Sequence, residues 1–279
     1  MTTTLARLRL IDQRPYTVHL HAEPEEVYAA GRKQHLSSHA LNEFRRNPLL
    51  FRKRELNLVP EERRAAYEVG RAIHTRVLEG ANTFATRYAV GGPINPKTNR
   101  TYGEDTKAFA EWAALQGRPV VSTDTAALCD AVSNAVHGHA QARDLLADGI
   151  AEGVARCDYG GVSSQVRIDW MHPGRGIIDL KSTDNLDWFE IEVRNFGYVH
   201  QQAFYRGVIG AIANRDVPVH LIAVEKREPY RVGVWQISSN SLQAAERDNL
   251  AAIERLQACR ATDRWPTGYE DIRVYDHIA

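Results

Sequence analysis

The stretch GIIDLKST, residues 176–183, holds an aspartate and a lysine two residues apart within a run of isoleucine and leucine. Side chains alternate between the two faces of a strand, so Ile177, Asp179 and Lys181 share one face, and Ile178 and Leu180 share the other. The two charged side chains therefore lie next to each other in an otherwise apolar strand. This placement indicates either a structural ion pair or a site that uses both charges.

The preceding strand brings a second aspartate to the same place. Asp169 lies in VSSQVRIDWM (162–171), and the turn composition HPGRG separates this stretch from the strand of Asp179. Cross-strand neighbours lie about 5 Å apart, so the two aspartates are expected to converge. Carboxylates that meet in an apolar setting tend to take up protons unless a cation holds both ionised. A hard divalent ion such as Mg²⁺ or Mn²⁺ meets that need.

The surrounding pattern predicts a mixed sheet flanked by helices, an α/β (α+β) fold. Three strand-like runs, at 150–159, 162–171 and 176–183, form an antiparallel meander, and two more lie at 217–226 and 230–238. We expect two short helices broken at Pro48, with Ser37 or Ser38 as a cap, and then helices at 61–79, 103–116, 123–147, 186–213 and 241–261. The Pro/Gly-rich stretch 90–103 indicates a loop within the domain. The expected organisation is a single domain over 1–279, with an N-terminal helical segment at 1–60 and a core at 61–279.

Composition limits the cellular context. Lys+Arg and Asp+Glu both number 35, so net charge indicates neither a nucleic-acid nor a membrane partner. The three cysteines, Cys129, Cys157 and Cys259, are far apart and suit a reducing compartment. No stretch approaches the roughly 18 apolar residues of a membrane span, and the N-terminus MTTTLARLRL lacks a long apolar core. We therefore expect a soluble, cytoplasmic protein.

Two further positions are candidates for the same site. His74 lies between Ile73 and Val77 on an apolar flank of the helix at 61–79. It is either a metal-site residue or a satisfied core histidine. Gln201 and Tyr205 are four residues apart and share one helix face. They either have a functional role, binding phosphate or the lysine, or belong to an ordinary helix surface.

In order, GRAIHTRVLEG, VRIDWM, IIDLKST and QQAFY resemble the histidine, Asp, Asp-x-Lys and Gln-x-x-x-Tyr motifs of the PD-(D/E)XK nuclease superfamily, RecB-like branch. More narrowly, the chain resembles the nuclease domain of RecE, the exonuclease of prophage RecET recombination systems, from about residue 36 to residue 266. The resemblance implies a restriction-endonuclease-like core. The PD dipeptide is absent, and Ile168-Asp169 takes its place.

The resemblance also implies roles for individual residues. Asp169 and Asp179 match the metal-binding aspartates, with the backbone carbonyl of Leu180 as a further ligand, and Lys181 matches the catalytic lysine. The remaining matches are His74 near the metal, Gln201 and Tyr205 on the Gln-x-x-x-Tyr helix, and Glu152 at an acidic position of the first strand. A glutamate at the start of a strand is also commonly only solvated.

The activity implied by the resemblance is Mg²⁺- or Mn²⁺-dependent hydrolysis, with one or two ions, of double-stranded DNA from its ends. Digestion would run 5′ to 3′ and leave 3′ tails for recombination, in a ring of three or four subunits, with a RecT-like annealing protein as partner. Two alternatives remain: a RecB-like endonuclease of repair or defence, and a non-catalytic DNA-binding protein on the same fold. The iron–sulfur members of the branch need four clustered cysteines, and the three here are scattered.

Basic residues cluster shortly before the His74 helix. They are Arg45, Arg46, Arg52, Lys53, Arg54, Arg63 and Arg64. They either follow the phosphates of DNA at the entrance of the site or form a solvated helix face.

Overall fold

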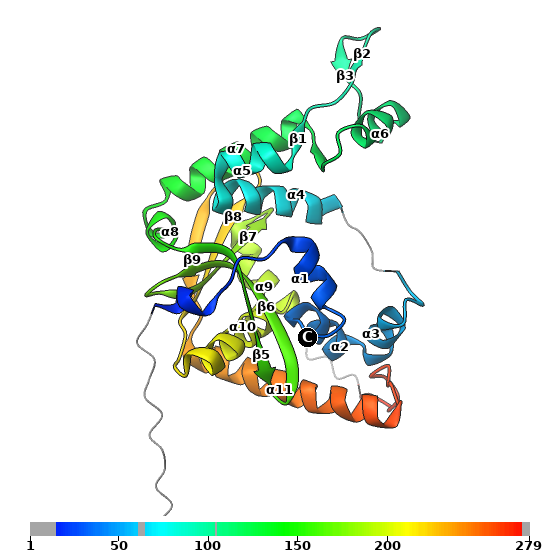
Figure 1. Cartoon of the computed structure of the whole chain (residues 1–279), viewed down its shortest axis with the longest axis vertical. Helices are drawn as coiled ribbons and strands as arrows, with labels where there is room; N and C mark the ends of the chain where they lie inside the picture. Colours follow the sequence, from blue (N-terminus) through cyan, green and yellow to red (C-terminus); the bar gives the residue numbers. More distant parts are fainter. Residues whose placement is uncertain (1–14, 61–64, 104, 275–279) are drawn as a thin grey trace, which may run out of the picture.

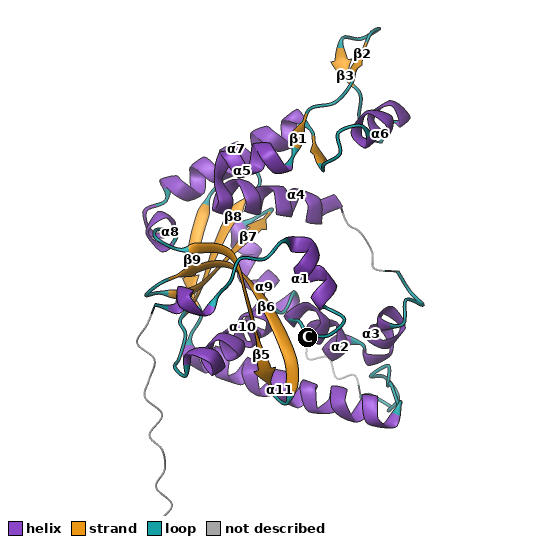
Figure 2. Cartoon of the chain, viewed as in Figure 1, coloured by secondary structure: helices purple, strands orange, loops and turns teal. Residues whose placement is uncertain are grey.

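The computed structural model describes residues 15–60, 65–103 and 105–274, and its centre is a five-stranded mixed sheet (Figures 1 and 2). The strand order is β5-β6-β7-β8-β9. The strands are β5 (Ile150–Tyr159), β6 (Val162–His172), β7 (Gly176–Thr183), β8 (Val219–Glu225) and β9 (Val232–Gln236). Strands β7 and β8 are parallel, and the other neighbours are antiparallel. The predicted α/β class and the antiparallel meander are confirmed.

Helices cover both faces of the sheet (Figure 2). One face packs against α4 (Ala65–His74), η2 (Thr75–Glu79), α5 (Gly80–Arg87), α7 (Thr123–Gly138) and α8 (Ala140–Leu145), and the other against α2 (Ser38–Arg46), α3 (Pro48–Glu55), α10 (Tyr198–Ala213) and α11 (Ser239–Thr262). Ile177 belongs to the core on the α10 side, and Ile178 and Leu180 belong to the core on the α4 side. The alternation predicted for GIIDLKST is therefore present.

The remaining elements are short. They are η1 (Tyr16–His19), α1 (Glu25–Gly31), η3 (Leu186–Trp188), α9 (Phe189–Asn195), β1 (Ala89–Val90), β2 (Ile94–Asn95), β3 (Arg100–Thr101), α6 (Lys107–Ala114) and β4 (Val120–Val121). The hairpin β2–β3 and α6 project from the body of the molecule (Figure 1). The stretch 90–103, predicted as a loop, thus contains a small hairpin.

Strands β6 and β7 separate part-way along the sheet. They pair at three positions only, ending at Trp170 opposite Ile178. Beyond that point β6 continues with β5 as a two-stranded ribbon that reaches α11 (Figure 1). Asp169 is the first β6 residue past the last pair, so it lies at the fork. Glu152 is opposite Asp169 in the β5–β6 register and has a positive φ of 55°, a local irregularity of the kind found where strands bend near functional sites.

Two predicted helices are interrupted. The helix expected at 186–213 is broken at Gly197, whose φ of 72° lies in the left-handed region, which glycine adopts without steric cost. The helix expected at 123–147 is divided at His139, an extended residue whose ring caps α8. Ser37 caps α2, because its side chain accepts a hydrogen bond from the Ala40 N–H, and Asn47 caps α3, which begins at Pro48.

Candidate functional site

The two predicted aspartates lie on either side of the fork. Asp169 Oδ2 accepts a hydrogen bond of 3.0 Å from the Leu180 N–H, and Asp179 is only 1% exposed. Burial, together with the nearby Asp179 charge, raises the pKa of Asp169 to about 7, although Lys181, the Leu180 N–H and Arg167 act in the opposite direction. The fork therefore brings together two carboxylates that resist being charged at the same time.

Lys181 lies beside this pair. Its Nζ is 2.5 Å from Asp179 Oδ2 and 4.7 Å from the centroid of the Tyr198 ring, which opens α10. Burial acts to lower the pKa of Lys181, but the attraction of Asp179 and Asp169 outweighs it, and the pKa is raised. The side chain therefore remains an ammonium at neutral pH, which suits it to neutralise anionic charge and not to accept a proton.

His74 and Glu152 complete an acidic and imidazole cluster. His74 Nδ1 lies 3.5 Å from Asp169 Oδ2, and ligand atoms of His74, Glu152 and Asp169 all lie within 4.8 Å of one another. Burial and Lys181 lower the pKa of His74, so the imidazole is neutral at neutral pH and can act as a ligand. Burial and Asp169 raise the pKa of Glu152, even though Arg167 Nε donates to it at 2.6 Å.

The helix that carries His74 changes its winding at this residue. α4 ends at His74, and the π-helical turn η2 follows directly. Single π turns inside helices are rare and often occur at functional sites. Ile73 and Val77 pack in the core on this side of the sheet, whereas the His74 side chain is 25% exposed. His74 is therefore not enclosed as a core histidine would be.

Gln201 and Tyr205 approach the fork from the opposite face of the sheet. The Gln201 amide donates a hydrogen bond of 3.2 Å to the Tyr205 hydroxyl, and Tyr205 is 8% exposed. Burial raises the pKa of Tyr205 well above its ordinary value, and Tyr28, Asp169 and Asp179 add to the effect. Tyr205 therefore lies within electrostatic range of both aspartates, and Gln201 is joined to it by the hydrogen bond.

The donor set suits a hard divalent cation. Both Asp179 oxygens are buried, and within the described residues neither accepts a hydrogen bond of good geometry, so the Lys181 ammonium is the partner of this carboxylate. Carboxylate oxygens and a neutral imidazole are ligands that Mg²⁺ and Mn²⁺ accept. One group of possible ligands consists of Asp169, Glu152 and His74. Asp179 lies on the other side of the fork, where its carboxylate is paired with Lys181. The Leu180 backbone acts to raise the pKa of His74, against burial and Lys181, so it lies close to the same group.

The predicted DNA-contacting residues differ in their surroundings. Arg54 is paired with Glu43. Arg52 is paired with Glu55 at 2.8 Å, and its guanidinium lies over the Trp265 ring at 5.1 Å. Lys53 is exposed on α3. Arg63 and Arg64 lie outside the described residues. The ion pairs of Arg52 and Arg54 show that these two side chains have structural partners within the chain.

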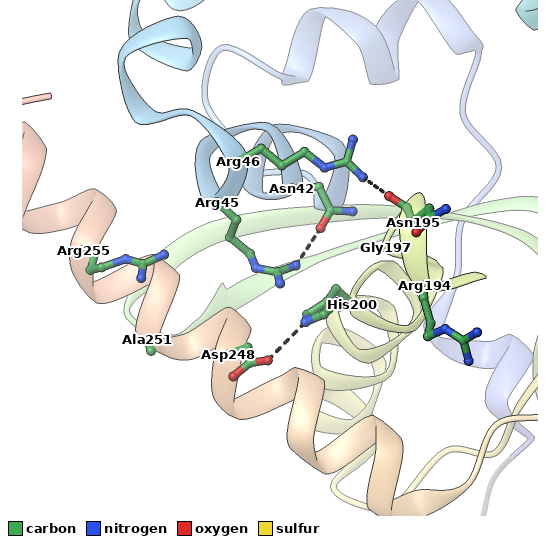
Figure 3. A pocket seen from close by; sticks show the side chains of 10 residues that line it. All are labelled: Asn42, Arg45, Arg46, Arg194, Asn195, Gly197, His200, Asp248, Ala251 and Arg255. Carbon is green, nitrogen blue, oxygen red and sulfur yellow. Dashed lines mark hydrogen bonds and ion pairs between the residues drawn. The ribbon is translucent and has the colours of Figure 1, made fainter. Parts of the chain in front are cut away.

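Arg45 and Arg46 instead line a pocket of about 350 Å³ (Figure 3). Arg45 donates to Asn42 Oδ1 at 3.0 Å, and Arg46 donates to the Asn195 carbonyl at 2.7 Å. Sequence reasoning missed three of the residues that join them, Arg194, His200 and Arg255. These lie on different elements far along the chain, and only the Gly197 break offered a local signal. Tyr198 and Arg167, the partners of Lys181 and Glu152, were also missed.

Comparison with known proteins identifies the family. The model of the PDDEXK-like domain of unknown function DUF3799 matches residues 37–277. The chain belongs to this family. None of the curated proteins matches it. Within the described part of the chain, every helix is too short or too polar to cross a membrane.

Two solved structures are similar to this chain. A protein of Eubacterium rectale named "Putative exonuclease" superposes with a TM-score of 0.65 at 13% identity, over 93% of this chain and 97% of that one. LHK-Exo in complex with dAMP superposes over 57% of this chain and 87% of that one, with a TM-score of 0.29 at 17% identity. The first likeness supports the fold. The family and the fold together favour a nuclease, as the order of motifs in the sequence predicts.

Proposed function

We propose that this PDDEXK-like protein is a Mg²⁺- or Mn²⁺-dependent exodeoxyribonuclease that degrades linear double-stranded DNA from its ends. The observation that carries the proposal is the Asp169, Asp179 and Lys181 arrangement at the fork, with His74, Glu152 and Tyr205 around it. Carboxylates that repel each other, next to a lysine whose pKa is raised, form a site suited to a cation and a phosphodiester.

Asp169, Asp179, Glu152, His74 and the Leu180 carbonyl are the groups that would hold one or two ions. A bound divalent ion supplies an acidified water and neutralises charge on the phosphate. Lys181 then neutralises charge that gathers on the phosphate oxygens in the transition state. The Tyr198 ring, 4.7 Å from Nζ, restricts the position of the ammonium. Gln201 orients the Tyr205 hydroxyl, which remains protonated and able to donate.

The finer features of the proposal come from the resemblance to RecE. They are 5′ to 3′ polarity, 3′-tailed products used in homologous recombination, a ring of three or four subunits around the DNA, and a RecT-like annealing partner in the cytoplasm. An enclosing ring would explain a requirement for DNA ends, because a closed circle could not enter it.

The test compares linear duplex with covalently closed circular duplex of the same sequence, in Mg²⁺, with labels at either 5′ or 3′ ends. We expect the linear form to vanish progressively, with early release of the 5′ label, while the circle survives. Equal rates on both forms would indicate a RecB-like endonuclease instead. Binding without cleavage in Mg²⁺ or Mn²⁺ would indicate the non-catalytic DNA-binding alternative.

A further inference from the structure

A pocket rich in arginine lies next to the active site, on the far side of the α9–α10 turn. Arg194 and Gly197 line it, while Tyr198, the next residue along, contacts Lys181. The other walls come from α2, through Arg45 and Arg46, and from α11, through Arg255. Three separate elements therefore converge at this pocket. In Figure 3 the Arg255 guanidinium extends from α11 toward that of Arg45.

The charges around the pocket are unbalanced. Four arginines and one acidic residue, Asp248, line the pocket, and Asp248 is engaged by His200 Nε2 at 3.2 Å. Arg45 and Arg46 donate to neutral oxygens, those of Asn42 and the Asn195 backbone. Within the described residues, Arg194 and Arg255 form no recorded ion pair, unlike Arg52 and Arg54 on the neighbouring helix. The pocket thus concentrates positive charge that the protein itself does not neutralise.

The backbone at the N-terminus of α10 adds hydrogen-bond donors, and these carry partial positive charge, as the arginines carry full positive charge. α10 is 16 residues long and begins after Gly197, with no side chain capping its N-terminus. The first N–H groups of a helix lack intrahelical partners and carry the positive end of its dipole, and Gly197 and His200, at this end of α10, line the pocket. Planar guanidinium groups together with free N–H groups match the oxygens of a phosphate.

We propose that this pocket holds a phosphate of the DNA strand next to the phosphodiester in the active site. The inference rests on the proposed nuclease function and extends it, because it assigns Arg45, Arg46, Arg255 and the α10 N-terminus to one phosphate on a defined side of the cleaved bond. The strand would then pass over the Gly197–Tyr198 peptide, between the pocket and Lys181.

The test measures binding of a short duplex in EDTA, so that no cleavage occurs. Arg45→Ala and Arg255→Ala should each weaken binding roughly tenfold, the usual effect of losing one charge-assisted contact, and should each reduce the slope of log affinity against log salt by about 1. Asp248→Asn should strengthen binding. Arg247→Ala, at an exposed position of the same helix outside the pocket, is the matched control and should bind like the wild type.

Single methylphosphonate substitutions in the duplex locate the contact. At one position the substitution should weaken binding by the wild type more than binding by Arg255→Ala, because the two changes share a contact and their losses are then not additive. Additive losses at every position, or Arg255→Ala binding like Arg247→Ala, would overturn the inference. The inference would also be overturned if Arg255→Ala weakened the binding of inorganic phosphate but left the binding of DNA unchanged. The pocket would then bind a free anion and not the DNA strand.

Failure of the proposed function gives a different result. A wild-type protein that neither binds nor cuts DNA removes both ideas. A wild-type protein that degrades linear DNA, together with an Arg255→Ala variant of unchanged affinity and salt slope, removes only the phosphate pocket.

Discussion

The Leu180 N–H donates a hydrogen bond of 3.0 Å to Asp169 Oδ2, although the ladder between their strands has already ended at Trp170 and Ile178. A side chain thus takes the place of a main-chain acceptor where the strands part. This contact holds the Asp169 carboxylate at the fork. The site follows from how the sheet opens as much as from the acidic residues themselves.

Asp179→Asn should abolish DNA degradation and leave the protein folded. Loss of groups that only orient metal ligands costs 10–100-fold, so loss of a ligand should exceed about 100-fold. The apo protein should stay folded, because Asp169 remains near Lys181 as a counter-charge. Single-turnover rates and thermal melting of one preparation measure both properties. A variant of near wild-type rate would remove Asp179 from the metal site.

Lys181→Met should lose activity and, unlike Asp179→Asn, also lose stability in EDTA. It leaves Asp179, 1% exposed, next to Asp169 without the ammonium, and removing one partner of a buried pair typically costs about 3–5 kcal/mol. Mg²⁺ should raise the melting temperature of this variant more than that of the wild type, since the ion supplies the missing positive charge. Equal shifts in both proteins would contradict an ion held by Asp179.

His74→Gln should reduce activity strongly and change the melting temperature little. The side chain is 25% exposed and lies 3.5 Å from Asp169, so the substitution removes a ligand without opening a sealed cavity. Metal affinity, measured by titration of Mn²⁺, should fall with activity. A large loss of stability with unchanged affinity would instead support the core-histidine alternative.

Apo stability should fall as pH rises toward neutrality. The ordinary pKa of an aspartate side chain is 3.8, and the pKa of Asp169 in the folded chain is raised to about 7. Between these values the folded state holds a proton that the unfolded state has released, so the free energy of unfolding decreases with pH and levels off above about 7. Urea unfolding in EDTA at a series of pH values should show a shallower decrease for Asp169→Asn. Identical pH profiles would show that this carboxyl is not perturbed.

Arg54→Ala and Lys53→Ala should separate structural from DNA-contacting charge on α3. Arg54 is paired with Glu43 on α2, so its loss should lower stability by about 1 kcal/mol with little effect on DNA affinity. Lys53 is exposed, and its loss should leave stability unchanged and weaken DNA binding if α3 lies along the substrate. Urea unfolding of both variants measures the effect on stability, and fluorescence anisotropy with labelled DNA measures the effect on affinity.

Much of this architecture could be predicted because alternation and turn residues are local signals. The strand at 150–159 has the predicted bounds, and that at 176–183 also does. Asp169 and Asp179 follow from the hairpin that joins their strands. The break at Gly197 was missed because apolar residues continue on both sides of it, and one glycine is compatible with a helix interior.

Other features depend on tertiary arrangement and leave little local trace. Arg255 and Arg45 line one pocket only because α11 packs against α2. The pairing of Arg54 with Glu43 depends on how α2 and α3 meet at Asn47. Charge clusters in sequence therefore did not distinguish arginines with partners from arginines that line the pocket.

The early end of the β6–β7 ladder leaves β7 with an unpaired side in the interior of the molecule. From Asp179 to Thr183 this strand pairs, among the described residues, with β8 and not with β6, so the peptide groups on its other side are available to a side chain, as the Leu180 N–H is to Asp169, or to a metal ion. Sheet edges usually attract another strand, whereas this edge borders the residues that we propose hold the metal ions. A change that extended the β6–β7 ladder by one or two more pairs would close the proposed catalytic centre without replacing any of its side chains.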